Sequence, residues 1–179
     1  MLEFFVGSYS LDEFKKYYST LFDLRDYYVS RTGREPGPMV LGQDEEQHVK
    51  RDPNHLIVWV DRGEIVGHCI WHETSTDEMS PGDPRNREDS EYLKQLLGGK
   101  KENLVELHEL WLRSDHRGKG FGHQFFSFFE DYISERGFDG IVHYTDHEAV
   151  VTLCRKRGYT EAFVESSGWF IFALLFSID

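Results

Sequence analysis

The segment "SDHRGKGFGHQFF", residues 114–126, has glycines at three alternate positions, and aromatic residues at helical spacing follow. The preceding stretch "LVELHELWL", residues 104–112, predicts a strand. A loop between a strand and a helix N-terminus offers unpaired backbone N–H groups, and the helix dipole favours an anion there. Glycine lets the backbone approach a ligand closely and adopt positive φ. Because Arg117 and Lys119 add positive charge in a chain of net charge -12, the segment predicts a phosphate-binding loop.

Two common phosphate loops fit this segment poorly. A Walker A loop requires G-x-x-x-x-G-K-[ST], but Lys119 is followed by Gly120. A dinucleotide loop requires G-x-G-x-x-G, and its third glycine position is occupied by His123, whose side chain would obstruct close helix–strand packing. Two aspartates downstream lie at a suitable distance to bind a ribose: Asp139 and Asp146. An NAD(P)-binding oxidoreductase therefore stays open as an alternative.

A third pattern, [Q/R]-x-x-G-x-[G/A], is matched by Arg117, Gly120 and Gly122. With its context, "LHELWLRSDHRGKGFG", the segment resembles the pyrophosphate-binding motif of the GNAT superfamily of acyl-CoA-dependent N-acetyltransferases. It is most similar to the polyamine acetyltransferase branch. The later stretch "VTLCRKRGY", residues 151–159, resembles another helix of this family, and the order of elements along the chain is also similar. Residues 1–52 are supported by that order alone.

The resemblance implies that the chain uses acetyl-CoA as a co-substrate. Backbone N–H groups from Gly118 to His123 would bind the pyrophosphate, and the end of the preceding strand would pair with the pantetheine arm. The implied cofactor-binding residues are Leu110, Trp111, Leu112, Arg117, Gly118, Lys119, Gly120, Phe121, Gly122 and His123.

Acetylation of an amine needs a base, because an amine with a pKa of about 10.4 is protonated at pH 7. Family members often place a base on the strand before the loop, at positions that match Glu106 or His108, and polyamine acetyltransferases have an acid where this chain has His108. Strand alternation predicts that Glu106 and His108 share one face and that Glu109 lies on the other. The pKa of histidine lies near 7, which suits a base. His108 could instead be a core histidine with satisfied hydrogen bonds.

The later helix differs from the family pattern at Cys154. The family usually has a tyrosine there, the presumed proton donor to the coenzyme A thiolate. A thiol with a pKa near 8.5 can donate a proton, although cysteine is also common as a small buried side chain. Tyr144 and Tyr159 are nearby alternatives. We therefore predict His108, Glu106 and Cys154 as the catalytic residues.

The rest of the chain predicts an α/β fold with a mixed sheet. Ser10 and Glu13 form a capping-box pattern before one amphipathic helix over residues 11–29, and Arg62-Gly63 predicts a tight hairpin. The expected order is β-α-α-β-β-β-α-β-α-β-β, with helices on both faces of a central twisted sheet, as in the GNAT fold. The segment 74–103 is long for a connection, so we expect it to be functional or disordered, apart from a short helix near 90–97. We expect residues 1–179 to form one GNAT domain.

Composition excludes several classes of protein. A net charge of -12 argues against nucleic-acid binding and mildly favours a cationic substrate. Neither Cys69 nor Cys154 belongs to a disulfide framework or zinc motif, and His68, His72, His143 and His147 lack zinc-site spacing, so we predict no metal. No run approaches the roughly 18 apolar residues of a membrane span, so we expect a cytoplasmic protein without membrane contact.

We therefore predict an N-acetyltransferase that transfers an acetyl group to a primary amine, by direct attack of the amine on the thioester. The amine is expected to belong to a small molecule, whose identity the sequence does not give. A catalytically weak acyl-CoA-binding or sensing module is the alternative, because Cys154 and His108 both depart from the family pattern. Family members are often dimers, so a homodimer is also considered.

Overall fold

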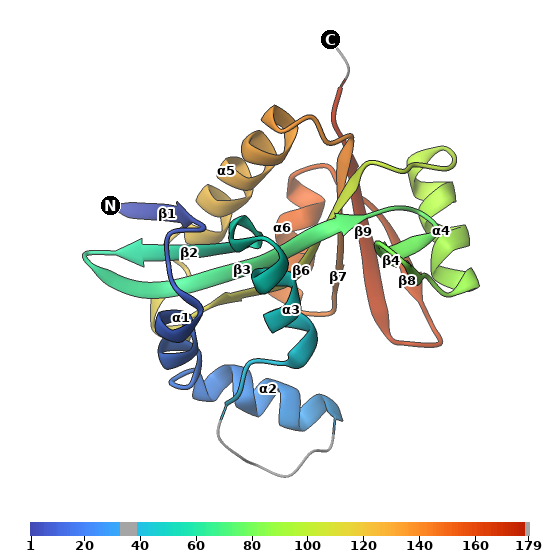
Figure 1. Ribbon diagram of the computed structural model, residues 1–179. Coiled ribbons are helices and arrows are strands. Elements are labelled where there is room, and N and C mark those ends of the chain that lie inside the picture. The colour runs from blue at the N-terminus through green and yellow to red at the C-terminus, as the bar shows by residue number, and fades with distance from the viewer. Residues whose placement is uncertain (33–38, 178–179) are drawn as a thin grey trace. The chain divides into compact units, whose positions relative to one another are not determined.

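The computed structural model describes residues 1–32 and 39–177, and its central feature is a seven-stranded mixed sheet (Figure 1). Strands β6 and β7 pair in parallel, whereas β1–β2, β2–β3, β7–β9 and β8–β9 pair antiparallel. The strands lie in the order β1 (Leu2–Val6), β2 (Leu56–Asp61), β3 (Glu64–Thr74), β6 (Leu104–Leu112), β7 (Gly140–Thr145), β9 (Trp169–Leu175) and β8 (Thr160–Val164). This architecture confirms the predicted mixed α/β fold.

The chain divides into two compact units. The first comprises Met1–Ile70 and Glu109–Phe121, and the second comprises Trp71–His108 and the chain from Gly122 onward. Strands β3 and β6 therefore each contribute residues to both units.

The first unit contains β1, β2, most of β3 and three α-helices: α1 (Leu11–Tyr18), α2 (Phe22–Thr32) and α3 (Gln43–Arg51). A short 3₁₀ helix, η1 (Pro53–His55), precedes β2. Buried side chains from the helices, including Phe14 and Leu24, form one apolar cluster with Leu56 and Val58 of β2. The predicted hairpin is present between β2 and β3, with Arg62 and Gly63 both at positive φ.

The predicted capping box is also present: the Ser10 backbone N–H donates to Glu13 Oε2 at 2.9 Å, and the Glu13 N–H donates to Ser10 Oγ at 3.2 Å. The helix that follows is shorter than predicted, because a break after Tyr18 separates α1 from α2. At this break Ser19 Oγ donates to the Lys16 carbonyl and Thr20 Oγ1 to the Tyr17 carbonyl, each at 2.7 Å. Such hydroxyl groups compete for backbone carbonyls and interrupt a helix that the apolar spacing alone would continue.

The second unit contains the remaining strands and the helices α4 (Arg87–Leu97), α5 (Phe121–Glu135, from its second residue) and α6 (Glu148–Lys156). The long polar connection is structured here, as strands β4 (Glu78–Ser80) and β5 (Asp83–Pro84) followed by α4, which lies beside β8 and β9 (Figure 1). Leu93 and Leu97 of α4 pack with Leu104, Val142 and Ile171 of the sheet. Among the described residues, no helix is both long and apolar enough to cross a membrane.

Strands β6 and β7 diverge within the second unit. Their pairing runs from Leu104 opposite Gly140 to Leu107 opposite His143 and then stops. Beyond that point β7 continues to Thr145 with β9 as its partner. His108 is consequently the first residue of β6 beyond the paired stretch.

Candidate functional site

The predicted phosphate loop lies between β6 and α5, after a single 3₁₀ turn, η2 (Ser114–His116). Gly118 and Gly120 have φ values of 76° and 80°, in the left-handed region that side chains rarely adopt. A Cβ atom at either glycine would meet no described atom within 4 Å, and residues 117–120 are all exposed. The glycines therefore serve backbone conformation, and the space beside the loop can accept a ligand group.

The Arg117 side chain connects this loop to the end of β6 through two contacts. Its Nε donates to the Leu112 carbonyl at 3.0 Å, and its guanidinium lies 4.7 Å from the centre of the Trp111 ring. Trp111 is buried, whereas Leu110 and Leu112 are half-buried. The strand end and the loop that the sequence assigns to the cofactor thus form one connected segment of the first unit, with Lys119 exposed on it.

The last two predicted cofactor residues lie in the first turn of α5. A Cβ atom on Gly122 would come within 3.3 Å of Leu153 Cδ2, so this glycine permits close packing of α5 on α6. His123 is exposed, and its Nδ1 lies 3.2 Å from Nη1 of Arg157. The third glycine of the motif therefore has a packing role that differs from that of the first two.

Glu106 is a buried carboxylate in the second unit. Its Oε2 lies 3.1 Å from His72 Nε2, an ion-pair distance, yet this oxygen has no hydrogen-bond partner among the described residues because the two groups are not aimed at each other. Burial raises the pKa of Glu106, but contact with His72 and the charges of Arg85 and His108 outweigh this effect and lower the pKa below its usual value. Glu106 is thus held ionised in the interior.

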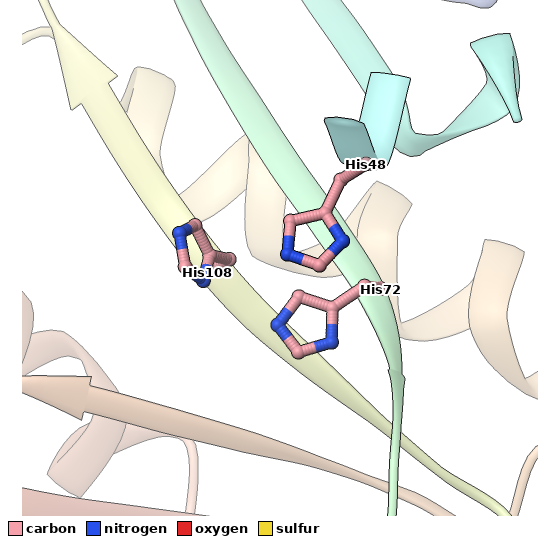
Figure 2. A group of neighbouring side chains, drawn as sticks. All are labelled: His48, His72 and His108. Atoms are coloured by element: carbon pink, nitrogen blue, oxygen red, sulfur yellow. The ribbon is translucent and has the colours of Figure 1, made fainter. Parts of the chain in front are cut away.

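His72 and His108 lie beside Glu106 on neighbouring strands. Figure 2 shows the two imidazole rings on β3 and β6, and their centres are 5.2 Å apart. His72 Nδ1 is 2.8 Å from the Glu73 carbonyl oxygen, which can only accept, so this nitrogen carries a proton. His72 is buried and His108 is half-buried. His72 thus lies beside both Glu106 and His108, and the catalytic assignment of Glu106 and His108 stays a prediction.

Arg85 and Tyr144 border the same part of the second unit. Arg85 Nη1 donates to the Tyr144 hydroxyl at 2.6 Å, and the guanidinium lies 5.6 Å from the centre of that ring. The buried Arg85 also donates to the carbonyls of Ser75 and Glu78. Burial raises the pKa of Tyr144, and Arg85 opposes this effect. The Tyr144 oxygen accepts in this hydrogen bond, so the hydrogen of its hydroxyl takes no part in it.

Cys154 lies in a different environment from Glu106 and His108. Its side chain is fully buried on α6, and burial raises the pKa of the thiol to about 12. The thiol makes no hydrogen bond or ion pair in the part of the chain that the structure describes. Nearby, the buried hydroxyl of Tyr159 donates to Glu130 Oε1 at 3.0 Å. Neither thiol nor phenol is ionised at neutral pH.

Glu109 is the centre of a buried network in the first unit. His68 Nε2 lies 2.6 Å from its Oε1, and the hydroxyls of Tyr18 and Tyr28 donate to its Oε2 at 3.1 Å and 2.7 Å. The Tyr17 hydroxyl lies 3.2 Å from the other ring nitrogen of His68. Burial and the Glu109 charge raise the pKa values of all three tyrosines. Every oxygen of this carboxylate is therefore satisfied.

No sequence pattern indicated Arg85 or His72 as neighbours of the predicted catalytic residues. Arg85 lies in the long polar connection, where no motif distinguishes it from other charged residues. His72 lacks zinc-site spacing along the chain, and its contact with Glu106 depends on how two strands distant in sequence are arranged. An apolar-flanked histidine on a predicted strand would have been the one available hint.

A comparison with family models gives a match over most of this chain. Residues 17–159 match the family model described as Acetyltransferase (GNAT) family. No curated protein matches by sequence.

Solved structures show similar folds at low sequence identity. The NatC complex bound to Gag peptide and CoA aligns with 15% identity and a TM-score of 0.61, covering 98% of this chain and 99% of that one. The GNAT domain of S. lividans PAT aligns with 14% identity and a TM-score of 0.64, covering 98% and 89%. The polyamine N-acetyltransferase of Drosophila melanogaster, which forms N-acetylagmatine, aligns with 15% identity and a TM-score of 0.62, covering 97% of this chain and 100% of that one.

Proposed function

The chain belongs to the GNAT family of acetyltransferases, which act with coenzyme A, and we propose that it transfers the acetyl group of acetyl-CoA to the primary amine of a small molecule. One observation carries the cofactor assignment: an exposed glycine loop at positive φ leads directly into the N-terminus of α5. Gly118 to His123 would bind the pyrophosphate through backbone N–H groups. The strand end from Leu110 to Leu112 would hold the pantetheine arm.

The small-amine assignment is supported by charge. The net charge of -12 favours the approach of a cationic acceptor over that of an anionic one. The polyamine acetyltransferase from Drosophila has the same fold and acts on such an acceptor, while the NatC complex binds a peptide. A peptide N-terminus is therefore the competing acceptor.

His108 and Glu106 are the proposed proton acceptors. An ammonium group must lose a proton before its nitrogen can attack the thioester carbonyl. His108 is the more exposed of the two residues, so we assign it to take the proton from the amine. Glu106 is buried and held ionised, so we assign it to stabilise the positive charge that the His108 imidazole then carries.

The leaving thiolate requires a proton donor, and Cys154 is the proposed one, because it occupies the family's tyrosine position. Its thiol retains its proton at neutral pH, since burial raises its pKa to about 12. Tyr144 is the alternative donor, with its hydroxyl oxygen polarised by Arg85. Turnover by Cys154→Ala and by Tyr144→Phe distinguishes them, because only the true donor should lower kcat when removed.

The cofactor assignment is tested by ligand-induced stabilisation. Acetyl-CoA and coenzyme A should raise the Tm, whereas NAD and NADP should not. Gly120→Glu should abolish this rise, because its carboxylate would repel the phosphates. Gly82→Glu is a matched control: it lies in the β4–β5 turn at φ 83°, with similarly open surroundings. Stabilisation by NAD alone would contradict the assignment.

The reaction is tested with a panel of diamines, polyamines, arylalkylamines and peptide N-termini. His108→Ala should lower the transfer rate about 100-fold, the usual contribution of a general base, with little change in coenzyme A affinity. Glu106→Gln should give a smaller loss, and the exposed Glu102→Gln should give none. Binding of acetyl-CoA without transfer to any amine would favour a sensing module instead.

A further inference from the structure

We infer that Arg157 and Glu130 of the second unit orient the His123 imidazole, so that its Nε2–H group donates a hydrogen bond to the pyrophosphate of coenzyme A. This inference rests on the proposed function and deepens it, because it adds an oriented side-chain donor to the backbone N–H groups of the loop. His123 is then a cofactor-binding residue, and Arg157 and Glu130 are positioning residues that act through it.

The tautomer of His123 follows from its contact with Arg157. Arg157 Nη1 lies 3.2 Å from His123 Nδ1. A guanidinium can only donate, so Nδ1 accepts this hydrogen bond and carries no proton. The proton of the neutral ring is therefore on Nε2. Among the described residues the His123 ring has no other hydrogen-bond partner, and its side chain is exposed, so the Nε2–H group is available to a ligand.

Glu130 fixes the position of the Arg157 guanidinium. Its carboxylate accepts from Arg157 Nε at 2.8 Å and also from Nη2, which is a two-bond, fork-like contact. The Tyr159 hydroxyl donates to the same carboxylate at 3.0 Å, and Ser127 Oγ accepts from Arg157 Nη1 at 3.3 Å. The side chains of Arg157 and Glu130 are only 14% and 16% exposed. The guanidinium therefore has little freedom, and the N–H group that points at His123 keeps its direction.

His123 lies beside the backbone groups that we assign to the pyrophosphate. It is the third residue of α5, so its own backbone N–H is one of those that the helix N-terminus leaves unpaired. Gly122, directly before it, allows α5 to pack closely on Leu153 of α6. This packing brings Arg157, at the C-terminal cap of α6, to the first turn of α5. The side chain and the backbone of His123 can therefore act on the same anion.

The charge of Arg157 is a poorer explanation for phosphate binding than its contact with His123. The guanidinium is paired with the Glu130 carboxylate, and this contact raises the pKa of Arg157. A pair of opposite charges has no net charge, so it attracts a distant anion much less than a lone cation does. A hydrogen-bond donor depends instead on its direction, which the contact with Arg157 supplies.

The first measurement is the tautomer of His123 in the protein without ligand, at pH 8, where an ordinary imidazole is neutral. Long-range ¹H–¹⁵N correlation spectra distinguish the two neutral tautomers, and His123→Ala identifies the signal. Wild type should have its proton on Nε2 alone. Arg157→Lys, which keeps the charge but lacks the fork, should show a mixture of both tautomers. Arg155→Lys is the matched control, because Arg155 makes the same two-bond contact with Glu161 from the last turn of α6.

The second measurement is the affinity for coenzyme A by calorimetry. His123→Ala should weaken binding about 10-fold, as expected for the loss of a hydrogen bond to a charged group. Arg157→Lys should weaken binding to a similar extent, but it should have no further effect in the His123→Ala background, because both changes remove the same contact. Arg155→Lys should bind as wild type does. Dephospho-coenzyme A, which lacks the 3′-phosphate, should give the same ratio of affinities between wild type and His123→Ala.

Four results would overturn the inference. A proton on Nδ1 in wild type would contradict the orientation of the ring. Wild-type affinity in His123→Ala would show that the side chain does not contact coenzyme A. Additive losses in the double variant would show that Arg157 acts independently of His123, and disappearance of the His123→Ala effect with dephospho-coenzyme A would move the contact to the 3′-phosphate.

Failure of the proposed function would look different from all four. Wild type would then show no binding of coenzyme A at all, which would contradict the acetyltransferase assignment and this inference with it. The four results above instead require that wild type has the expected affinity for coenzyme A, or concern the protein without ligand. Far-UV circular dichroism verifies that each variant is folded.

Discussion

His143 should make the stability of this protein depend on pH in a defined window. The side chain is buried on β7, and its Nδ1 donates to the Leu107 carbonyl at 2.7 Å. Burial lowers the pKa of His143 to about 4, against the opposing effects of that hydrogen bond and of the Glu106 charge, and the His108 charge lowers it further. The imidazole is therefore neutral in the folded state at pH 7 and protonates only in acid.

The size of this stability change follows from the pKa values of His143 in the folded and unfolded states. In the unfolded chain His143 titrates near 6.5, so between pH 6.5 and pH 4 the unfolded state binds a proton that the folded state does not. Stability must therefore fall as pH decreases through this window, and it is fully retained above pH 6.5. The difference between about 6.5 and about 4 corresponds to about 3 kcal/mol, at 1.36 kcal/mol per pH unit.

Substitution by asparagine isolates this contribution, because asparagine does not titrate and its amide can still donate to Leu107. Urea unfolding would be followed by tryptophan fluorescence at pH 7, 6, 5 and 4, for wild type and for His143→Asn. The variant is expected to be less stable at pH 7. The difference in free energy of unfolding between wild type and variant should then decrease by about 3 kcal/mol by pH 4. His123→Asn, at an exposed histidine, is the control. A difference in free energy of unfolding that stays constant from pH 7 to pH 4 would refute the reasoning.

Two further predictions concern the buried network and the long connection. Tyr28→Phe should lower the free energy of unfolding by about 1.5–3 kcal/mol, because it removes a 2.7 Å hydrogen bond to the buried Glu109 carboxylate. Chemical denaturation measures this loss. Tyr9→Phe, a control outside the network, should lower the free energy of unfolding by less. Hydrogen bonds from Lys94 and Ser90 hold the pKa of Asp77 at about 2. The contribution of Asp77 to folding stability is therefore present above pH 3.8 and is lost as pH falls toward 2. Denaturation curves at pH 5 and pH 2.5 should therefore show wild type losing more stability than Asp77→Asn, and parallel losses would contradict this account.

The fold could be predicted largely from local signals. The strand at 104–112, the glycine loop and the aromatic helix follow one another in the sequence, and the structure places β6, the loop and α5 in those positions. The hairpin at Arg62-Gly63 and the capping box at Ser10 depend only on neighbouring residues, so they were also predictable. The break after Tyr18 was not, because the apolar spacing continues through it and the interruption comes from hydroxyl groups that bond to the backbone.

The candidate site was predictable only in part. The family pattern directs attention to Glu106 and His108, which lie on one strand. The residues that act on Glu106 come from another strand and from the long connection. His72 is 34 residues before Glu106 in the sequence, and Arg85 follows a turn that no motif indicates. Such tertiary relations depend on strand pairing, which a period-2 pattern leaves undetermined.

The two acidic residues of β6 show why alternation alone misleads. Glu109 contacts His68, and Glu106 contacts His72. The histidines are four residues apart on β3, which alternation places on one face, whereas the glutamates are three apart, which alternation places on opposite faces. Alternation alone therefore does not predict both contacts, one of which lies in each unit.

Strand β6 carries two buried carboxylates in contrasting environments, and the contrast indicates which one is available for chemistry. Glu109 receives hydrogen bonds from a histidine and two tyrosines, so any reaction at its oxygens would first have to break contacts that stabilise the first unit. Glu106 has an oxygen without a hydrogen bond among the described residues and stays ionised in the interior. A buried charge that is left incompletely satisfied costs stability, and such a cost is usually retained where a proton or a cation has to be bound. The unsatisfied carboxylate is therefore the one to which we assign a part in the acetyl-transfer chemistry.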